Sequence, residues 1–589
     1  MPVSTEPNVL SNLARYNRFL LLVAGLGGLL YGIDVGIIGG ALPYLQATSN
    51  LNPSQLSIIV AAVLLGSVIS TLFAGLLADW MGRKPLMILS GLAFTLSVPV
   101  IALSSGFGPL FFGRLLQGVS GGLVGVVVPL YLAECLSAKE RGRGTGVFQW
   151  LLTLGIFAAA LIGVYYSYHV AEIARTGSAD ALYNAKNDAW RRIFWMSMPP
   201  GLLFVLGGFF VTESPRWLYR HGKTAQAKAA LLRSRTPDQA ELEFSEMGQI
   251  AADAVRQPGV TRNDSLLRRR YVLPFLLACV ILTCNTATGI NSVIGYNTDI
   301  LLQSGLSDVL AHWGYVVFTA MNFLMTIVGM TLVDRKGRKF LFTVGTTGII
   351  VSMVMVGILF MRSERFRTDW RGAVQPIVTA NQTLDFNPNR TDFWKVSGQD
   401  IPATQVQSLA IIYSYGDFSG STTPVRSNDA AAPTIQINRS DAVPSGKVQA
   451  FFRNPFADLD AARTAPLKIE HAYLSPVPSA LNGWLVAIFL YTFVAFYAMG
   501  PGVCVWLALS ELMPTRIRSN GMSIALVLNQ MVSTTLAGIF LPVVGKYGYS
   551  SMFFLFAGFT VVYLITVVFF LPETKGKTLE EIEKHFEAA

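Results

Sequence analysis

Twelve apolar runs dominate this sequence, and each is long enough to cross a lipid bilayer as a helix. Within a bilayer the chain must satisfy its own backbone polar groups, so runs of this kind predict membrane-spanning α-helices. Only 14% of the residues are charged, against about 25% in soluble domains, which fits an integral membrane protein. The predicted spans are residues 18–44, 54–79, 86–105, 108–133, 144–168, 190–212, 271–303, 308–333, 340–361, 480–508, 518–545 and 549–571.

Lys and Arg gather in the loops that follow spans 2, 4, 6, 8 and 10. Cytoplasmic loops carry such an excess, so the pattern predicts that both termini are cytoplasmic. We therefore expect a multi-pass protein of the cell membrane, surrounded by lipid, and of the inner membrane if the source is bacterial. The net charge of +10 lies in short loops rather than on one soluble face, which argues against nucleic-acid binding.

A short motif occurs twice, as Gly75–Lys84 and as Gly329–Lys339. Each copy ends an apolar run and contains an Asp, a Gly turn and a basic pair, before the next apolar run begins. The repeat indicates an internal duplication. The expected fold class is an all-α membrane protein with twelve transmembrane helices in two six-helix bundles.

The spacing of two repeated landmarks locates an insertion. Asp79 and Asp334 are 334 − 79 = 255 positions apart, whereas Glu134 and Glu511 are 511 − 134 = 377 positions apart. The extra residues fit the polar stretch 362–479, which follows the ninth span and is expected on the outer side. Alternating residues in 434–438 and 447–452 predict short strands there.

These observations divide the chain into five expected units. The units are an N-terminal six-helix bundle (1–212), a cytoplasmic helical linker (213–270), a C-terminal six-helix bundle (271–361 and 480–571), an extracytoplasmic insertion (362–479) and a cytoplasmic tail (572–589).

Asp34 lies in the middle of the first apolar run. A carboxylate near the centre of a spanning helix costs about 2.5–3.5 kcal/mol on insertion scales, so such a residue usually faces a cavity and has a partner. Arg114, at the start of the fourth run, is the expected partner. A pair that parts and rejoins changes the proton affinity of the carboxylate, so the two residues predict a proton-coupling site. The alternative is a static buried ion pair that joins helices 1 and 4.

Amide and hydroxyl side chains form a second group within the apolar runs. Amides both donate and accept hydrogen bonds, which suits a neutral polyhydroxyl ligand, and an aromatic ring can stack on a sugar face. Such groups are expected near the midplane of a transporter, although each could also join two helices. The candidate substrate-binding residues are Gln149, Asn285, Thr286, Asn291, Tyr296, Asn322, Trp506, Asn529 and Gln530.

Motifs of enzymes and cofactor sites are missing from the sequence. The five histidines are scattered without an HExxH pattern, and neither a GxSxG motif nor a phosphate-binding loop is present. The four cysteines lack CxxC spacing and fit core packing. We therefore expect no enzymatic activity, no catalytic residue, no cofactor and no metal.

The motifs together resemble the sugar porter family of the major facilitator superfamily, and in particular its bacterial proton-coupled sugar symporters. The resemblance covers the chain except the insertion and about the first dozen residues. It is carried by Gly75–Lys84, Arg114, Pro129–Glu134, Arg141-Gly142, Glu213–Leu218, Asp334–Arg338, Gly500–Gly502, Glu511, Arg518 and Pro572–Gly576.

The resemblance implies two bundles that rock around a central sugar site, with Asp34 at the position where proton-coupled members carry Asp. It also implies that Gln149, Asn291, Asn322, Trp506 and Asn529 contact the sugar. Charge pairs are implied at the cytoplasmic face, where they should hold the outward-open state and part as the inner gate opens. The expected members of this latch are Asp79, Arg83, Glu134, Arg141, Glu213, Arg216, Asp334, Arg338, Glu511, Arg518 and Glu573.

Three positions depart from the family pattern. Asn285-Thr286 replaces a Gln-Gln pair, Gly295-Tyr296 replaces two tyrosines, and Gln530 stands where a Trp is common. The substrate therefore stays open between a monosaccharide and a polyol. The leading hypothesis is proton-coupled symport by alternating access. The alternatives are a facilitative sugar or inositol uniporter, a sugar sensor that does not transport, and an enzyme built on the insertion.

Overall fold

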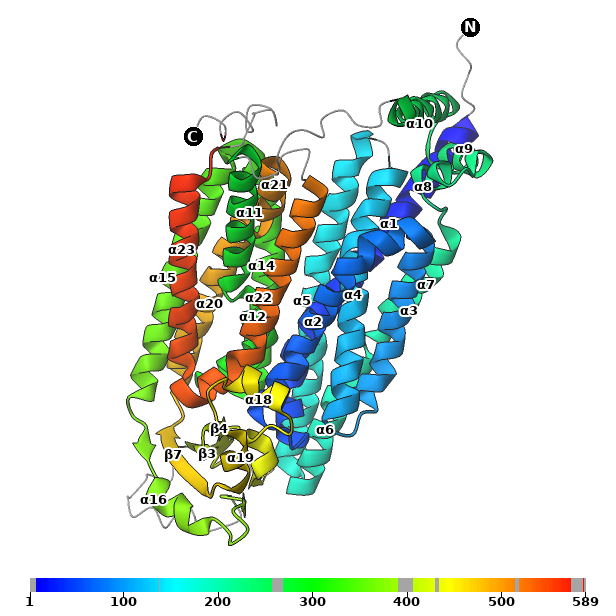
Figure 1. Cartoon of the computed structure of the whole chain (residues 1–589). Helices are drawn as coiled ribbons and strands as arrows, with labels where there is room; N and C mark the ends of the chain where they lie inside the picture. The colour runs from blue at the N-terminus through cyan, green and yellow to red at the C-terminus, as the bar shows by residue number, and fades with distance from the viewer. Residues whose placement is uncertain are drawn as a thin grey trace.

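The structure is a computed structural model in which the chain forms a helical body with a small β-sheet at one end (Figure 1). It describes residues 7–136, 138–256, 269–389, 406–428, 434–513, 518–573 and 586.

Twelve helices in the described ranges are long and apolar enough to cross a membrane, as the sequence predicts. They stand side by side in two bundles of six (Figure 1). We call the end where α1 begins and α23 ends the terminal face, and the end that carries the strands the insertion face. The first bundle contains α1 (Pro7–Thr48), α2 (Pro53–Met81), α3 (Arg83–Ala102), α4 (Phe107–Cys135), α5 (Ala138–Thr176), α6 (Ala179–Trp195) and α7 (Met198–Phe210). The second contains α11 (Arg269–Ala287), α12 (Ile290–Gly295), α13 (Asn297–Gln303), α14 (Asp308–Lys336), α15 (Arg338–Glu364), α20 (Ala480–Met499), α21 (Pro501–Leu512), α22 (Arg518–Tyr547) and α23 (Tyr549–Phe570).

Three of the spans are broken into shorter helices. In the seventh span Gly289 has a φ of +86°, a left-handed conformation that glycine adopts without steric cost, and it separates α11 from α12. In the tenth span the break falls at Gly500, directly before Pro501, whose ring prevents a continuous helix. The sixth span breaks between α6 and α7, where a proline follows in the first turn of α7. These breaks place irregular backbone inside the helical body.

Helices α5 and α6 extend farther toward the insertion face than the apolar runs predict. The runs end at residue 168 and begin again at residue 190, whereas α5 continues to Thr176 and α6 begins at Ala179. Ser178 caps α6 by accepting a hydrogen bond of 3.2 Å from the backbone N–H of Ala181. The added turns are polar, so a search for apolar residues does not detect them.

The repeated motif forms the same turn in both bundles. Gly82 has φ +100° and ψ 165°, and Gly337 has φ +90° and ψ 162°. Residues other than glycine rarely adopt such a φ, so the turn requires glycine in both copies of the motif. Each turn leads directly into the next helix, α3 or α15. The duplication seen in the sequence is therefore present in the backbone geometry.

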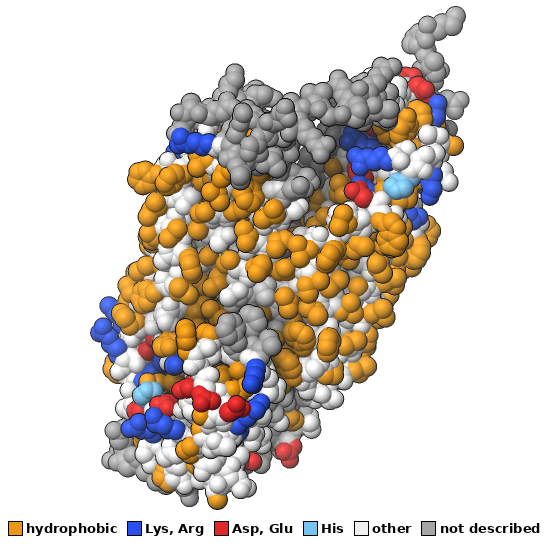
Figure 2. All heavy atoms as spheres, viewed as in Figure 1, with side chains coloured by type: hydrophobic (Ala, Val, Ile, Leu, Met, Phe, Trp, Pro, Cys, Tyr) orange, Lys and Arg blue, Asp and Glu red, His pale blue; other side chains and the backbone are white. Residues whose placement is uncertain are grey.

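Apolar side chains cover a broad band on the visible face of both bundles, and charged side chains gather at its two ends (Figure 2). Exposed apolar residues of the spanning helices include Leu76, Trp80, Phe112 and Phe569, each at least 65% exposed. Exposed apolar surface of this extent is expected where lipid, rather than water, surrounds the helices.

Three short helices, α8 (Pro215–Arg220), α9 (Thr224–Ser234) and α10 (Pro237–Arg256), follow the first bundle at the terminal face (Figure 1). Arg235, only 2% exposed, connects them to the bundle. Its guanidinium contacts the carbonyl oxygen of Cys135 at the end of α4 and forms an ion pair of 2.9 Å with Glu243 of α10. Arg235, which lies between α9 and α10, therefore attaches these two helices to the end of α4.

The insertion folds into a five-stranded antiparallel sheet with the strand order β1-β7-β3-β4, and β5 also pairs with β3. A separate two-stranded ladder joins β2 and β6, so the alternation in residues 434–438 does form a strand. The strands are β1 (Thr368–Asp369), β2 (Leu384–Phe386), β3 (Gln407–Tyr415), β4 (Phe418–Ser421), β5 (Val425–Arg426), β6 (Ile435–Ile437) and β7 (Leu467–Pro476).

The strand predicted at residues 447–452 is wrong, because these residues belong to helix α18 (Lys447–Arg453). Val448, Phe451 and Phe452 also have the i, i+3, i+4 spacing of a helix. An alternation over six residues therefore cannot distinguish the two structures. The described part of the insertion holds four further short helices: α16 (Arg371–Val374), η1 (Gln375–Ile377), α17 (Arg439–Ala442) and α19 (Leu459–Thr464).

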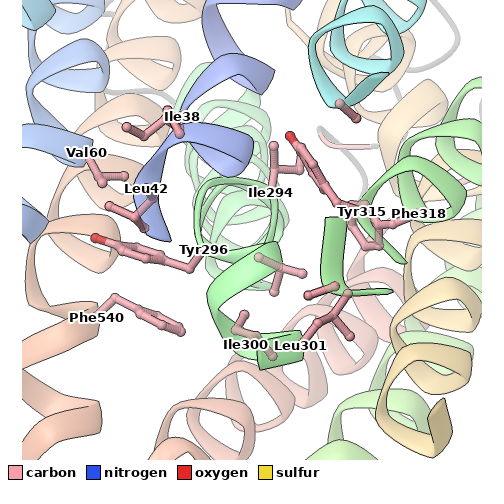
Figure 3. Packing of buried hydrophobic residues seen from close by; sticks show 14 of the residues in the cluster. Ile38, Leu42, Val60, Ile294, Tyr296, Ile300, Leu301, Tyr315, Phe318 and Phe540 are labelled. Atoms are coloured by element: carbon pink, nitrogen blue, oxygen red, sulfur yellow. The ribbon is translucent and has the colours of Figure 1, made fainter. Parts of the chain in front are cut away.

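The two bundles pack against each other in the half nearer the insertion face. One buried apolar cluster contains residues of both bundles, including Ile38, Leu42 and Val60 of the first and Ile294 and Phe540 of the second. Figure 3 shows Leu42 and Val60 of the first bundle near Tyr296 and Phe540 of the second. The bundles are therefore in direct contact on this side.

Candidate functional site

Asp34 and Arg114 lie together in the interior of the first bundle. Their side chains are 1% and 2% exposed, and Nη1 of Arg114 is 3.9 Å from Oδ1 of Asp34. Among the described residues, neither oxygen of Asp34 accepts a hydrogen bond. The guanidinium of Arg114 also lies 5.6 Å from the ring centroid of Phe194 in α6. The pair that the sequence predicts is therefore buried, and its partners are separated by more than a hydrogen-bond distance.

Small residues of α4 allow this arrangement. A methyl group on Gly121 would lie 2.8 Å from Oδ2 of Asp34 and 3.2 Å from the ring of Tyr31, both on α1. Atoms this close would clash, so the absence of a side chain at Gly121 gives Asp34 its space. The glycine-rich sequence of α4 thus positions a carboxylate as well as packing two helices together.

Four of the predicted substrate-binding residues come together inside the second bundle. The hydroxyl of Thr286 contacts Oδ1 of Asn529. The amide of Asn291 donates a hydrogen bond of 2.7 Å to Ser533 Oγ. Asn285 donates one of 3.2 Å to Tyr497, while its carbonyl oxygen has no partner in the described residues and is buried. These contacts join the broken seventh span to α20 and α22.

Tyr31 of the first bundle lies close to Gln530 of the second bundle. The phenol of Tyr31 lies close to Asp34, one turn away on α1, and close to Gln530 of α22. Gln530 of the second bundle is therefore linked through Tyr31 to the pair of Asp34 and Arg114.

The structure places Tyr296 away from the amide group. Its hydroxyl donates a hydrogen bond of 2.8 Å to the carbonyl oxygen of Ala537, and its ring stacks on Phe540 at 4.3 Å. It also lies 3.2 Å from Ser57 Oγ of α2, in the region where the bundles meet (Figure 3). Tyr296 thus belongs to the contact between bundles in this structure.

The remaining substrate predictions have fewer described contacts. Gln149 lies on α5 and Asn322 on α14, and the residues that follow them, Trp150 and Phe323, have ring centroids 5.5 Å apart. The two helices thus meet at this level. Trp506 is part of α21, but its side chain lies outside the described residues.

Sequence reasoning overlooked a set of contacts that close the insertion face. Tyr44 of α1 donates a hydrogen bond of 2.8 Å to Oδ2 of Asp308 on α14. His312 lies 3.1 Å from the carbonyl oxygen of Gly40 through Nε2, and Tyr315 donates a hydrogen bond of 2.9 Å to the carbonyl oxygen of Gly36. A polar residue every three or four positions on α14 was the signal that could have identified them.

Sequence reasoning also overlooked Gln117, which lies one turn after Arg114 on α4. Nη1 of Arg114 donates a hydrogen bond of 2.6 Å to Oε1 of Gln117, whose side chain is fully buried. A buried amide at i+3 from a buried arginine was the available signal.

The first charge cluster at the terminal face centres on Arg83. Its guanidinium is 2.9 Å from Asp79 and 2.9 Å from Glu134, and it donates a hydrogen bond of 2.8 Å to the carbonyl oxygen of Ala78. Glu134 also contacts the hydroxyl of Ser214. Asp79, Arg83 and Glu134 are thus brought together as predicted.

Glu213 caps the N-terminus of α3. Its carboxylate accepts hydrogen bonds of 3.0 Å and 3.2 Å from the backbone N–H groups of Arg83 and Lys84. Burial raises the pKa of Glu213, and hydrogen bonds from the backbone of Ser214, Lys84 and Arg83 oppose that rise. Arg216 is exposed, and makes none of the described contacts of this cluster.

The second bundle repeats the arrangement. Arg338 lies 3.0 Å from Glu511, and Glu573 accepts hydrogen bonds of 3.1 Å and 3.2 Å from the backbone N–H groups of Arg338 and Lys339. The side chains of Arg141, Asp334 and Arg518 lie outside the described residues. The pairs named here all join elements of one bundle, so in this structure they brace each bundle internally.

Two six-helix bundles, with polar side chains between apolar helices, define a membrane transporter of the major facilitator fold. The family described as "Sugar (and other) transporter" matches residues 20–416 and 468–586, and the chain belongs to this sugar porter family. It is a family of transporters rather than of enzymes.

Relatives of known name match nearly the whole chain. The human "Proton myo-inositol cotransporter" is 27% identical over 97% of this chain and 82% of its own. The "Glucose transporter GlcP" of Staphylococcus epidermidis is 26% identical over 96% of this chain and 97% of its own. Among solved structures, the inward-open xylose transporter XylE of E. coli has a TM-score of 0.62 and 20% identity, covering 96% of this chain and 98% of its own. That similarity shows the shared fold.

Proposed function

We propose that the protein carries a neutral monosaccharide or polyol across the membrane together with protons, with Asp34 as the proton site. The observation that carries the proposal is the buried position of Asp34, 3.9 Å from Arg114 and without a hydrogen-bond donor in the described residues. An ionised carboxylate in such a place costs several kcal/mol unless a cation compensates for it. Taking up a proton removes this cost, so the charge on Asp34 is sensitive to the distance of Arg114.

The proposed substrate follows from the amide group. Asn285, Asn291 and Asn529 offer donors and acceptors without a net charge, and the carbonyl oxygen of Asn285, which has no partner in the described residues, can accept a hydrogen bond from a hydroxyl group. A ligand with several hydroxyl groups satisfies such a site, whereas an ion gains little from it. The relatives named for myo-inositol and glucose support this substrate class.

We propose that the terminal face is cytoplasmic, so that both termini lie inside the cell and the insertion lies outside. The cell membrane is the proposed location. The proposed rocking bundles are residues 1–212 for the first, and residues 271–361 together with 480–571 for the second. Residues 213–270 and 572–589 are the proposed cytoplasmic segments, and residues 362–479 form an outer cap. Contact between the bundles near the insertion face then corresponds to a state closed to the outside.

Transport by reconstituted protein tests the proposal. Purified protein in liposomes is given labelled xylose, glucose or myo-inositol, with and without an inward proton gradient. We expect the gradient to drive accumulation of at least one of them. Asp34→Asn should abolish accumulation and retain exchange across the membrane. The matched control is Asp460→Asn, since Asp460 has a 72% exposed side chain in the insertion.

Other results would favour the alternatives. Exchange by the wild-type protein without accumulation would indicate a facilitator, and binding without any flux would indicate a sensor. Accumulation that is unchanged in Asp34→Asn would remove Asp34 from the mechanism.

A further inference from the structure

Arg114 has two acceptors within its reach, and it lies closer to the neutral one. The same nitrogen, Nη1, is 2.6 Å from Oε1 of Gln117 and 3.9 Å from Oδ1 of Asp34. Gln117 lies one helical turn after Arg114, on the same face of α4. The arginine is therefore held by its own helix, at a distance from the carboxylate on α1.

The hydrogen bond fixes how Gln117 is oriented. A guanidinium only donates hydrogen bonds, so the amide must present its oxygen to Arg114. Its nitrogen Nε2 then points elsewhere, and it has no acceptor among the described residues although the side chain is 0% exposed. A buried donor without an acceptor destabilises the folded protein. The arrangement thus leaves polar groups of Gln117 and of Asp34 unsatisfied at the same time.

The separation matters for the charge on Asp34. If Arg114 moved from 3.9 Å to a hydrogen-bonded distance of about 2.8 Å, its attraction for the carboxylate would rise about 1.4-fold at constant dielectric, and a charge-assisted hydrogen bond would form. A closed pair holds the carboxylate in its ionised form. The distance set by Gln117 therefore decides how readily Asp34 accepts a proton.

We infer that Gln117 is a positioning residue, which competes with Asp34 for Arg114 and keeps the ion pair open so that the carboxylate can be protonated. The inference rests on the proposed function, because it assigns the proton site to Asp34.

The surroundings offer few other charges. In the described residues, the titratable groups that face the pair are the two partners themselves and Tyr31, on α1. The neighbours from α2 and α6, Ser67 and Phe194, carry no charge. A change at Gln117 should therefore act on Asp34 through Arg114.

The direct test is a titration of the Asp34 carboxyl group. Infrared spectroscopy of purified protein detects the band of a protonated carboxyl group, and its loss in Asp34→Asn identifies it. In Gln117→Leu, Arg114 loses its competing acceptor and closes on Asp34. We expect the pH midpoint of the band to fall by at least about one unit. Gln117→Glu adds an anion beside Arg114 and should move the midpoint in the opposite direction.

Gradient-driven uptake provides the second readout. Gln117→Leu should lose most of its uptake at neutral outside pH and recover it when the outside pH is lowered by the same interval as the infrared midpoint. Gln436→Leu, on the exposed side of β6, is the matched control and should behave like the wild type. A loss that no pH restores would mean that Gln117 is needed only for packing.

The two proposals fail in different ways. An infrared midpoint that is the same in the wild type, Gln117→Leu and Gln117→Glu would overturn the inference about Gln117, whatever the transport result. Wild-type protein that accumulates no sugar under a proton gradient would overturn the proposed coupling, while a shifted midpoint would still support the role of Gln117. If Gln117→Leu does not fold, the infrared midpoints of Gln117→Glu and the wild type are compared instead. A higher midpoint in Gln117→Glu supports the positioning role of Gln117, and an equal midpoint overturns it.

Discussion

Tyr44 of α1 donates a hydrogen bond of 2.8 Å to the carboxylate of Asp308 on α14, and so joins the two bundles at the insertion face. The same carboxylate lies 3.3 Å from Nδ1 of His312, whose ring stacks on Tyr44 with centroids 5.3 Å apart. Three side chains from both bundles thus form one contact. In the proposed mechanism this contact must break before substrate can enter from the insertion side.

Tyr44→Phe should therefore favour the state that is open at this face. A single hydrogen bond contributes about 0.5–1.5 kcal/mol, so we expect an increase of about twofold to tenfold in the open population. Ile294→Cys provides a reporter, because Ile294 is 4% exposed between the bundles and all four cysteines are buried. A membrane-impermeant maleimide should label it faster in Tyr44→Phe. Tyr547→Phe, at a 62% exposed tyrosine, is the control, and equal labelling rates would contradict the role of Tyr44.

His312 should make the same closure sensitive to pH. Its Nδ1 lies 2.9 Å from the carbonyl oxygen of Asp308 and its Nε2 lies 3.1 Å from that of Gly40. Both atoms face acceptors, and only the imidazolium form has two N–H donors. The closed state is therefore stabilised at low pH and weakened as His312 loses its proton. The reactive thiolate form of any cysteine increases with pH, so the labelling rate at position 294 is divided by the rate of the same cysteine in His312→Phe at each pH. This ratio should increase as pH rises. A ratio that stays constant with pH would contradict the role of His312.

Gly121→Ala should impair transport while the protein still folds. The added methyl group would lie 2.8 Å from Oδ2 of Asp34 and would displace the carboxylate or α1 itself. We expect a fall of at least about tenfold in gradient-driven uptake, since a small shift of a reacting group is costly. Gly125→Ala on the same helix places its methyl group 3.6 Å from Tyr31, an ordinary contact, and should be nearly silent. Similar losses in both variants would point to helix packing rather than to Asp34.

Arg83→Ala should lower the thermal stability of the protein strongly. The side chains of Arg83 and Glu134 are 3% and 9% exposed, so removal of the arginine leaves a buried carboxylate without its cation. Loss of one partner of a buried pair costs about 3–5 kcal/mol. Arg338→Ala should cost less, because the side chains of Arg338 and Glu511 are 14% and 24% exposed. Scanning fluorimetry in detergent measures the melting temperature of both variants. An equal decrease in the two would show that burial of the ion pair does not determine how much stability is lost.

Binding should respond less than stability to these two changes. Both arginines lie at the terminal face, away from the amide group, so sugar affinity should be largely intact while transport slows. Lost affinity with a normal transport cycle would instead place Arg83 or Arg338 in the substrate site.

The insertion should lose stability in acid. Burial raises the pKa of Asp369, but hydrogen bonds from Ala472, His471 and Arg371 outweigh it and hold the pKa below its usual value. A carboxyl group with a lowered pKa stabilises the folded state at higher pH, and this contribution is lost as pH falls through its folded value. Protease cleavage within residues 362–479 should therefore increase below about pH 4. Asp369→Asn should be cleaved more readily at neutral pH and show less dependence on pH. Asp385→Asn, at an exposed position, is the control.

Much of the architecture could be predicted from sequence because lipid imposes a simple rule. A spanning helix needs about 20 apolar residues, so the twelve runs and the repeat around Asp79 and Asp334 suffice for the spans and the two bundles. The pairing of Asp34 with Arg114 was also predictable, because a charge inside a membrane requires a partner. The predictions missed the extra turns of α5 and α6, which are helical without being apolar.

The details that depend on side-chain direction could not be predicted. Tyr296 and Asn291 are five residues apart, yet Gly289 and the break after Gly295 turn one toward the bundle contact and the other toward Ser533. Gln117 is an ordinary polar residue in the sequence, and its role depends on a distance of 2.6 Å that only the fold defines. Strand order in the insertion depends on pairings between residues 52 (Tyr415 and Leu467) to 106 (Thr368 and Leu474) positions apart, which no local pattern encodes.

The sheet of the insertion is anchored to the second bundle. Ser550 of α23 donates a hydrogen bond of 2.5 Å to Glu364, at the point where the insertion leaves α15, and Arg426 of β5 donates one of 2.5 Å to the carbonyl oxygen of Leu302. The protein thus carries a folded feature beyond its apolar band, where a detergent micelle does not cover it (Figure 2). In single-particle electron microscopy, such a feature provides a reference by which the particle images can be aligned. It also offers a folded epitope, so an antibody fragment bound to it would report the orientation of the second bundle in each image.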